Sequence, residues 1–376
     1  MVLSLPWLCE LATMASMLEQ GALFDANVLG RPVPRVGEQK DILYFGTIAR
    51  TVLNRPETTG MGFWSLNPYV GCAFGCAYCY ARYAHRYSLD RAATAYPDHQ
   101  EMQSARDTMP FWLAFERRIF VKQNAAESLR KVLRHGSERH QALTHGESIV
   151  IGTATDPFQP AERQFRITRS ILEVLAEHPG LSVCIITKSP LITRDIDVLK
   201  RINRHSQLSI HLSLISLDRE LARRIEPRAP TPEARLRALT RLRDNGIETG
   251  INVMPVLPAI TDHPDALEGL VKAVAERGAS YLNACSLRLR ATARTRYLPF
   301  VEQEFPHLAK RYWATYGSSD KTSAQYSAQL KARLAELCDR YGVPFGHQGR
   351  SGEGQDPAAE VIAQRFAGVD QLGFEL

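Results

Sequence analysis

The chain has 376 residues, of which 44% are hydrophobic, and carries a formal net charge of +6. Its length suits one α/β barrel of about 200–250 residues with extensions, and its apolar content excludes a largely disordered protein. The mildly basic charge weakly favours a polyanionic partner, and no apolar stretch reaches the roughly 18 residues of a membrane helix, so no membrane partner is expected. Residues 1–17 lack the positive segment of a signal peptide and are expected to be a disordered leader, with Met17 as an alternative start.

Short apolar runs alternate with helical patterns from residue 63 onward, which is typical of repeated βα units. A strand over 63–69 is expected to lead into a cysteine-rich loop, and a helix over 80–90 follows the loop. After a polar insertion, the expected elements are a strand over 115–122, a helix over 125–134, a strand over 148–153 and a helix over 164–177.

The same alternation continues as far as residue 287. The expected strands cover 182–187, 208–214, 249–256 and 280–287, and the helices between them cover 195–203, 232–245 and 265–277. With the strand before the cysteine loop, this pattern makes six βα units. A barrel and a doubly wound open sheet are both compatible with it, although no Gly-x-Gly-x-x-Gly fingerprint follows the first strand. Beyond residue 300, helices are expected over 305–313 and 324–341, and a polar, glycine-rich tail begins at residue 349.

Three cysteines, Cys72, Cys76 and Cys79, lie within eight residues at C-x3-C-x2-C spacing, with the aromatic Tyr78 before the third. An iron–sulfur cube takes four ligands, so three thiolates leave one iron open for a second molecule to chelate. A structural zinc site is the main alternative, because His85 would complete a Cys3His set. The chain has no second C-x2-C pair to support zinc, and it is too large to need a disulfide framework.

The cysteine motif, on a short loop after an apolar strand, resembles that of the radical S-adenosylmethionine (radical SAM) superfamily. The resemblance implies an α/β fold, namely the incomplete (β/α)6 TIM-like barrel of the radical SAM type with N- and C-terminal extensions. It also implies a 4Fe–4S cluster on Cys72, Cys76 and Cys79, with S-adenosyl-L-methionine (SAM) at the open iron. Such an enzyme cleaves SAM reductively to a 5′-deoxyadenosyl radical, which abstracts hydrogen from a substrate, and it needs an external one-electron reductant of the flavodoxin or ferredoxin type. Thiolates and an oxygen-sensitive cluster fit a reducing cytoplasm, so a cytoplasmic location is expected.

Further segments resemble the branch related to spore photoproduct lyase, often described as DNA repair photolyases. They are Asn67-Pro68-Tyr69, Tyr80-Ala81-Arg82 and residues 152–160, 186–189, 225–228 and 255–262. The expected organisation is an N-terminal extension over 1–53, partly disordered, a core barrel over 54–298, and a helical C-terminal extension over 299–376 with a frayed tail. The resemblance implies a lyase or photolyase-like enzyme acting on DNA or RNA, while the residues leave a peptide or a metabolite open.

In βα barrels the chemistry collects at the C-terminal ends of the strands. The residues there that are expected to contact SAM are Tyr78, Thr155, Asp156, Lys188, Ser189 and Arg228. Asp156 would neutralise the amino group, whereas Lys188 and Arg228 would bind the carboxylate. Tyr78 would lie against the adenine, and Thr155 offers a hydroxyl. As alternatives, Thr155 and Asp156 can form a helix N-cap, Lys188 can pair with Glu226, and Arg228 can be solvated.

Cys285 ends the last expected strand, where its thiol would face the barrel interior and could donate a hydrogen atom to a substrate radical. A small core residue is the alternative. Spore photoproduct lyase carries its hydrogen-donating cysteine on the loop after the strand that corresponds to 148–153. This chain has Thr155-Asp156-Pro157 there and no thiol, so repair of the same DNA lesion is not expected.

Four arginines follow the sixth strand: Arg288, Arg290, Arg294 and Arg296. They can bind the phosphates of a nucleic acid or nucleotide substrate. A solvated face, or ion pairs with Glu302 and Glu304, explains them equally well. Two functions other than radical catalysis remain compatible with the residues. One is a zinc-stabilised nucleic-acid-binding module without catalysis, and the other is a cluster-based electron carrier or sensor.

Overall fold

Six parallel strands form the centre of the fold in the computed structural model, which describes residues 35–346 except 40, 83–88, 91, 95 and 135. The strands are β4 (Trp64–Leu66), β7 (Ser148–Ile151), β8 (Ser182–Thr187), β9 (Gln207–Ser213), β10 (Glu248–Val256) and β11 (Leu282–Ser286). Each strand pairs in parallel with the next one along the chain. The short strand β3 (Leu53–Asn54) adds an antiparallel edge beside β4.

The sequential strand order decides between the two fold classes that the sequence left open. The order β11-β10-β9-β8-β7-β4-β3 contains no reversal of direction along the sheet, so the doubly wound alternative is wrong. Within the described residues, β4 and β11 are not hydrogen-bonded to each other, so the barrel is incomplete. The predicted (β/α)6 class is confirmed, and its geometry gathers the C-terminal ends of the six strands at one end of the barrel.

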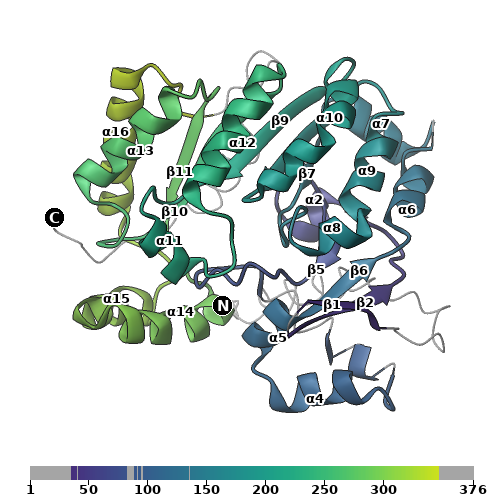
Figure 1. Ribbon diagram of the computed structural model, residues 1–376, viewed down its shortest axis with the longest axis horizontal. Coiled ribbons are helices and arrows are strands. Elements are labelled where there is room, and N and C mark those ends of the chain that lie inside the picture. The colour runs from purple at the N-terminus through teal and green to yellow at the C-terminus, as the bar shows by residue number, and fades with distance from the viewer. Residues whose placement is uncertain are drawn as a thin grey trace, which may run out of the picture.

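Helices cover the outer face of this sheet (Figure 1). They are α8 (Ala161–Phe165), α9 (Ile167–Leu175), the 3-10 helix η2 (Pro190–Asp195), α10 (Ile196–Asn203), α12 (Pro232–Asp244) and α13 (Pro264–Ala275). The helix α11 (Arg219–Ile225) instead packs its Ile225 against the cysteine loop. Successive residues of a strand point to opposite faces of the sheet, so β7 contributes to an apolar layer on each face. Ile149 and Ile151 join the main apolar core. Val150, between them, packs with Phe63 and Cys184 on the other face. Burying each such branched side chain contributes about 1.5–3 kcal/mol relative to exposure.

A second, four-stranded sheet stands beside the barrel (Figure 1). Its order is β1 (Arg35–Gln39), β2 (Ile42–Thr47), β6 (Arg118–Lys122) and β5 (Tyr69–Val70). The expected strand over 63–69 is therefore two strands, because β4 belongs to the barrel sheet and β5 to the second sheet. Pro68, between them, has no N–H to continue a ladder, which favours the break. The chain thus crosses from one sheet to the other before β5, and the cysteine loop begins directly after β5.

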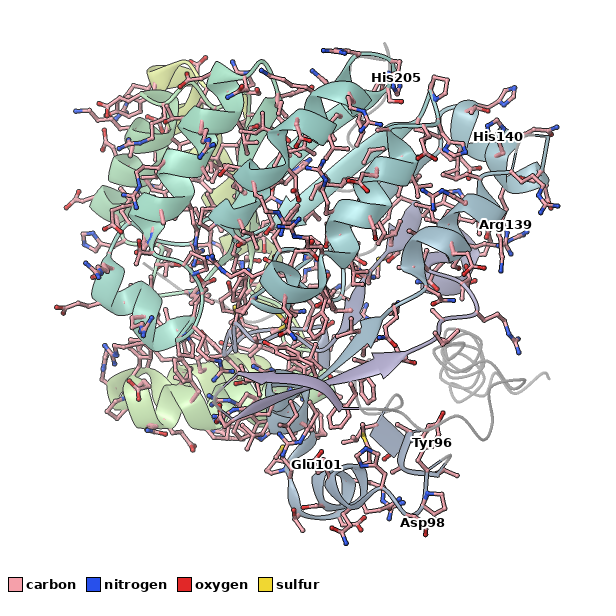
Figure 2. The ribbon with its side chains drawn as sticks, turned by 45° about the vertical axis from the view of Figure 1, so that its right-hand side comes forward. Tyr96, Asp98, Glu101, Arg139, His140 and His205 are labelled. Atoms are coloured by element: carbon pink, nitrogen blue, oxygen red, sulfur yellow. The ribbon has the colours of Figure 1, made fainter. Side chains whose placement is uncertain are left out.

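The region between the cysteine loop and β7 is more helical than its sequence pattern indicates. The expected strand over 115–122 begins only at Arg118, because its first residues end the helix α5 (Phe111–Arg117), which follows the helix-initiating Pro110. The other short helices of this region are α4 (Gln100–Thr108), α6 (Ala125–Val132) and α7 (Glu138–Thr144), whereas α2 (Pro56–Thr59) precedes β4. Figure 2 shows Tyr96, Asp98 and Glu101 around α4, at the opposite end of the molecule from His205. Most of the expected helix over 80–90 lies outside the described residues.

The C-terminal part is helical, as expected. It comprises α14 (Ala291–Glu304), the 3-10 helix η3 (Pro306–Leu308), α15 (Ala309–Tyr316) and α16 (Ala324–Tyr341). The sequence pattern missed α14, which contains Pro299. The α16 helix begins at Ser323, whose hydroxyl accepts from the Tyr326 amide at 3.1 Å, and ends at the left-handed Gly342.

Among the described residues, no helix is long and apolar enough to span a membrane. The expected leader over 1–17 and the expected tail from residue 349 lie outside the described residues. The division of the chain at residues 53 and 298 stays a prediction.

Candidate functional site

The cysteine loop is a compact turn whose thiols are largely enclosed. Cys72 and Cys76 are buried and Cys79 is half-buried, and all three are free thiols. Gly71 and Gly75 take the left-handed region at φ 88° and 70°, which allows the chain to fold back twice within a few residues. Cys72 and Cys76 pack in one apolar cluster with Phe74, so the loop itself contributes the apolar setting of its thiols.

The enclosure keeps two of the thiols protonated. Burial raises the pKa of Cys72 to about 12, and the carboxylate of Asp156 acts in the same direction. Burial also raises the pKa of Cys76 well above its ordinary value, although the ammonium group of Lys188 opposes the shift. Both groups are therefore neutral thiols near neutral pH, and a bound metal would have to displace their protons.

The donor set fits an iron–sulfur cluster better than a lone metal ion. Within the described part of the chain, no three or more His, Cys, Asp or Glu side chains gather as a single ion requires. A zinc ion needs every thiolate sulfur about 2.3 Å from one point, whereas a cluster binds each thiolate through a different iron. His85, the fourth ligand in the zinc alternative, lies outside the described residues.

Side chains from the loop after β7 fix the start of the cysteine loop. The hydroxyl of Thr155 donates to the carbonyl oxygen of Gly71 at 2.6 Å, and the Gln159 amide donates to the same oxygen at 3.1 Å. The Gln159 carbonyl accepts from the Ala73 amide at 2.9 Å. Thr155 is thus a structural partner of the cysteine loop, a role that the sequence analysis did not assign to it.

Asp156 links the loops that follow β7 and β8. Its Oδ1 accepts from the Phe158 amide at 2.9 Å and from the Thr187 hydroxyl at 2.7 Å, and its Oδ2 accepts from the Lys188 amide at 2.7 Å. Burial raises the pKa of Asp156, although these hydrogen bonds oppose the shift. The side chain does not cap α8, whose N-cap residue is Pro160. Ser189, next along the chain, caps η2 by accepting from the Leu191 amide at 3.3 Å.

Lys188, Tyr78 and Glu226 form a buried group beside Cys76. The Lys188 Nζ lies 5.6 Å from the centroid of the Tyr78 ring and 3.9 Å from Glu226 Oε1. The Tyr78 hydroxyl donates to Glu226 Oε1, and Arg235 Nη2 donates to Glu226 Oε2. The alternative pairing of Lys188 with Glu226 is therefore present as an ion pair, but its distance is longer than a hydrogen bond.

The opposite charges of Glu226 and Lys188 stabilise each other's ionised state. Burial alone would raise the pKa of Glu226, but Arg235 and Lys188 together hold it below its ordinary value. Burial alone would lower the pKa of Lys188, but Cys76 and Glu226 together hold it above its ordinary value. Near neutral pH the group therefore carries an ionised Glu226 and a charged Lys188 whose side chain is 16% exposed.

The guanidinium group of Arg228 is directed at the cysteine loop. Its Nε donates to the Ala73 carbonyl, its Nη2 donates to Glu116 Oε2 at 2.6 Å, and its backbone N–H donates to the Phe74 carbonyl at 3.2 Å. The side chain is 30% exposed, so only part of it meets solvent.

Cys285 lies on the same strand face of β11 as Asn283, two residues earlier. The Asn283 amide donates to Asn252 Oδ1 at 3.0 Å, and His211 Nδ1 lies 3.2 Å from the same oxygen. This face therefore carries a buried polar network from three neighbouring strands. Burial raises the pKa of Cys285 to about 11, opposed by Arg288, so the thiol is protonated at neutral pH.

The four arginines after β11 have separate surroundings. Arg294 donates to the carbonyls of Gly317 and Ser319 at 2.8 and 3.1 Å, and the Arg296 guanidinium lies 4.5 Å from the centroid of the Trp112 ring. Arg290 is exposed, and burial lowers the pKa of Arg288 to about 10. Of the acidic partners considered from sequence, Glu304 pairs with Arg224 at 3.0 Å, and Glu302 accepts from the Trp313 indole at 2.6 Å.

The sequence-family model of the Radical SAM superfamily matches residues 66–270 of this chain. The matched range includes the three loop cysteines, Asp156 and Lys188. The chain belongs to the radical SAM superfamily. It is therefore a radical SAM enzyme, and membership implies SAM and an iron–sulfur cluster as its cofactors.

Several known proteins are similar to this chain. An uncharacterized protein of Mycobacterium tuberculosis (strain ATCC 25618 / H37Rv) is 29% identical over 327 residues, covering 86% of this chain and 88% of that protein. A radical SAM Nalpha-GlyT isomerase of Pseudomonas phage M6 is 29% identical over 199 residues, 53% of this chain and 34% of the isomerase. Spore photoproduct lyase complexed with dinucleoside spore photoproduct has a TM-score of 0.53 at 15% identity, covering 84% of this chain and 86% of the lyase chain. The expected kinship with spore photoproduct lyase is confirmed at the level of the fold.

Two buried charges of this radical SAM site escaped the sequence analysis. Arg235, which donates to Glu226, lies on the same face of α12 as the buried Leu239 and Leu242. An arginine at helical spacing within an apolar face indicates a buried charge, and this pattern could have identified Arg235 from the sequence. Glu116, which holds Arg228, lies in a segment that reads as a strand. No local pattern distinguishes it from a solvated carboxylate, because its partners come from distant parts of the chain.

Proposed function

We propose that this radical SAM enzyme binds a 4Fe–4S cluster through Cys72, Cys76 and Cys79, cleaves SAM reductively, and directs the resulting 5′-deoxyadenosyl radical at a nucleic acid. The observation that carries the proposal is the position of the three thiols, on one enclosed loop next to Asp156 and Lys188. When bound, the cluster would supply one electron to SAM, giving methionine and the radical.

Lys188 is the proposed partner of the SAM carboxylate. Its ammonium group is charged, nearly enclosed, and 3.9 Å from Glu226, so no short ion pair saturates it. Glu226 in turn is held by Tyr78 and Arg235, which keeps its charge in place without drawing Lys188 into direct contact. A carboxylate entering beside the cysteine loop would gain a charge-assisted hydrogen bond from Lys188.

The remaining proposed SAM contacts involve polar atoms that can still form a hydrogen bond. Asp156 Oδ2 accepts one hydrogen bond in the structure, so it retains a lone pair for the SAM amino group. Tyr78 and Ser189 are proposed to face the adenosine. Thr155 and Arg228 are proposed to act indirectly, because their donors are directed at the carbonyls of Gly71 and Ala73.

Cys285 is the proposed hydrogen donor to the substrate radical. Its thiol carries the hydrogen at neutral pH, and it lies on the face of β11 that carries Asn283, whose amide donates to Asn252 of β10. Transfer of the S–H hydrogen atom would quench the substrate radical and leave a thiyl radical on Cys285. One electron from the external reductant and one proton would then restore the thiol.

The nucleic-acid substrate, DNA or RNA, is supported by the solved complex of spore photoproduct lyase with a dinucleoside and by the net charge of +6. An external one-electron carrier of the flavodoxin or ferredoxin type is the proposed reductant. The half-buried Cys79 and the neighbouring Tyr80, which is 47% exposed, mark the side of the loop that such a carrier can approach.

Anaerobic reconstitution with iron and sulfide tests the proposal. The expected result is about four irons per chain, in line with a cube on three cysteines and SAM, and release of 5′-deoxyadenosine from SAM after dithionite reduction. About one zinc per chain without iron–sulfur absorbance would contradict it, and a cluster without SAM cleavage would favour an electron carrier or sensor. Deuterated oligonucleotides, DNA against RNA, identify the substrate by deuterium transfer into 5′-deoxyadenosine.

A pair of lysine variants tests the SAM site. Lys188→Met is expected to leave the iron content unchanged and to weaken SAM binding by at least about tenfold, because a charge-assisted contact is lost. Lys122→Met is the matched control, since Lys122 is also buried but donates to the Asn67 carbonyl at 2.8 Å. Equal loss of SAM binding in both variants would contradict the assignment of Lys188.

A further inference from the structure

A buried carboxylate, Glu116, joins two arginines behind the cysteine loop. Its Oε1 accepts from Arg82 Nη1 at 2.8 Å, and its Oε2 accepts from Arg228 Nη2 at 2.6 Å. The side chains of Glu116 and Arg82 are 5% and 0% exposed. Three segments far apart in the chain therefore meet at one carboxylate that the proposed reaction does not use.

Both arginines direct further donors at the cysteine loop. Arg82 Nη2 donates to the Cys76 carbonyl at 2.5 Å, and Arg228 Nε donates to the Ala73 carbonyl. The two guanidinium groups thus hold carbonyls on either side of Gly75. Among the described residues, the hydrogen bonds of the Glu116 carboxylate come from the two arginines, so Glu116 acts on the loop through them.

The loop approaches this group so closely that Gly75 has no space for a side chain. A Cβ built at Gly75 would lie 2.6 Å from Arg228 Nη2 and 2.7 Å from Glu116 Oε2. Gly75 also has a φ of 70°, which other residues rarely adopt. A shift of Glu116 or Arg228 would therefore displace the backbone between Cys72 and Cys76.

The group carries more positive than negative charge. One carboxylate faces two guanidinium groups, and a third, that of Arg296, lies 4.5 Å from the centroid of the Trp112 ring. The Trp112 carbonyl accepts from Arg82 Nη1 at 2.7 Å, so this third cation lies next to the same group. Glu116 is the acidic side chain that ion-pairs with Arg82 and Arg228 among the described residues.

We propose that Glu116 is a positioning residue for the cysteine loop. It fixes Arg82 and Arg228 so that they hold the carbonyls of Cys76 and Ala73, and its charge offsets part of the positive field at the thiols. The loop-ordering role stands without a cofactor, and only the effect on the field rests on the proposed function. Loss of the Glu116 charge would favour the more reduced, more negative state of a cluster bound there, because two uncompensated cations would remain nearby.

Glu116→Gln tests both roles. In the protein without metal, hydrogen exchange of the amides from Ala73 to Tyr78 is expected to become about tenfold faster, because the arginines lose a charged partner. In the reconstituted protein, the cluster midpoint potential is expected to move in the positive direction, as measured by an EPR-monitored titration. Iron per chain is expected to stay within the range of the unaltered protein, which separates the charge effect from failure to bind a cluster.

Glu162→Gln is the matched control. Glu162 is a buried carboxylate paired with Arg194 at 2.9 Å, and it accepts from the amides of Thr168 and Arg169 and from the Tyr69 hydroxyl. These donors do not include Arg82 or Arg228. Equal acceleration of loop exchange in both variants, or none in Glu116→Gln, would overturn the positioning role. If the unaltered protein binds no cluster, the proposed function fails while the exchange measurement still decides the role of Glu116.

Discussion

The hydroxyl of Thr155 donates a hydrogen bond of 2.6 Å to the carbonyl oxygen of Gly71, 84 residues earlier in the chain. This contact joins Gly71, at the start of the cysteine loop, to the loop that follows β7. Gln159 reinforces it from the next turn, by donating to Thr155 Oγ1 at 2.9 Å. Side chains at the end of the barrel therefore help to fix the conformation of the cysteine loop. Substitutions of these side chains should change the stability of the protein or its capacity to bind iron.

Thr155→Val should lower the free energy of unfolding by about 1–3 kcal/mol, because the buried Gly71 carbonyl loses one donor and Gln159 loses an acceptor. Thr155→Ser keeps the hydroxyl and should recover most of that loss. Urea denaturation of the two variants measures the difference. Equal stability of the valine and serine variants would contradict a role for the hydroxyl.

Gly75→Ala should destabilise the protein and reduce iron incorporation, because the new Cβ meets both a positive φ and the groups of Arg228 and Glu116. Gly180→Ala is the control for φ alone, since Gly180 has a φ of 79° and nothing within 4 Å of its Cβ position. We expect a loss of about 1 kcal/mol for the control and several times that for Gly75→Ala. A similar loss in both variants would mean that the close contact matters little.

Lys122 should make stability rise with pH above about 8. Burial lowers its pKa from 10.5 to about 8, so between these values the unfolded chain binds more protons and unfolding becomes less favourable as pH increases. The full effect is about 3 kcal/mol, and it is absent below pH 8, where both states are protonated.

Lys122→Met removes this titration. The stability of the unaltered protein relative to Lys122→Met should therefore increase by up to about 3 kcal/mol from pH 8 to pH 10.5, as measured by urea denaturation at several pH values. A difference that stays constant over this range would show that the Lys122 ammonium is not held at a lowered pKa.

Cys285 should resist alkylation in the folded protein. Because burial raises its pKa to about 11, its thiolate fraction at pH 8 should be about 100-fold lower than that of an ordinary cysteine. Iodoacetamide labelling at pH 8, read out on the Cys285 peptide by mass spectrometry, should be slow in the folded chain and fast in urea. Cys285 is half-buried, so comparable rates in both conditions would show that its surroundings do not hold the thiol protonated and would argue against its role as a hydrogen donor.

The sequence predicted the parts of this protein that depend on local pattern. The spacing of Cys72, Cys76 and Cys79 is a local property, so it identified the superfamily without any knowledge of the fold. The six βα units also followed from sequence, because helix and strand periods are written into neighbouring residues. Lys188 and Asp156 could be selected because strand ends are predictable, and the structure brings both beside the cysteine loop.

Tertiary structure decided which polar groups meet. The roles of Glu116, Arg235 and Gln159 depend on partners that lie about 9 to 112 residues away, and those meetings are set by strand order and by the approach of loops. The split of residues 63–69 into β4 and β5 depends on a second sheet whose other strands lie elsewhere in the chain. Sequence alone therefore identified the cysteine loop and its superfamily, whereas long-range packing determined which side chains hold the loop in place.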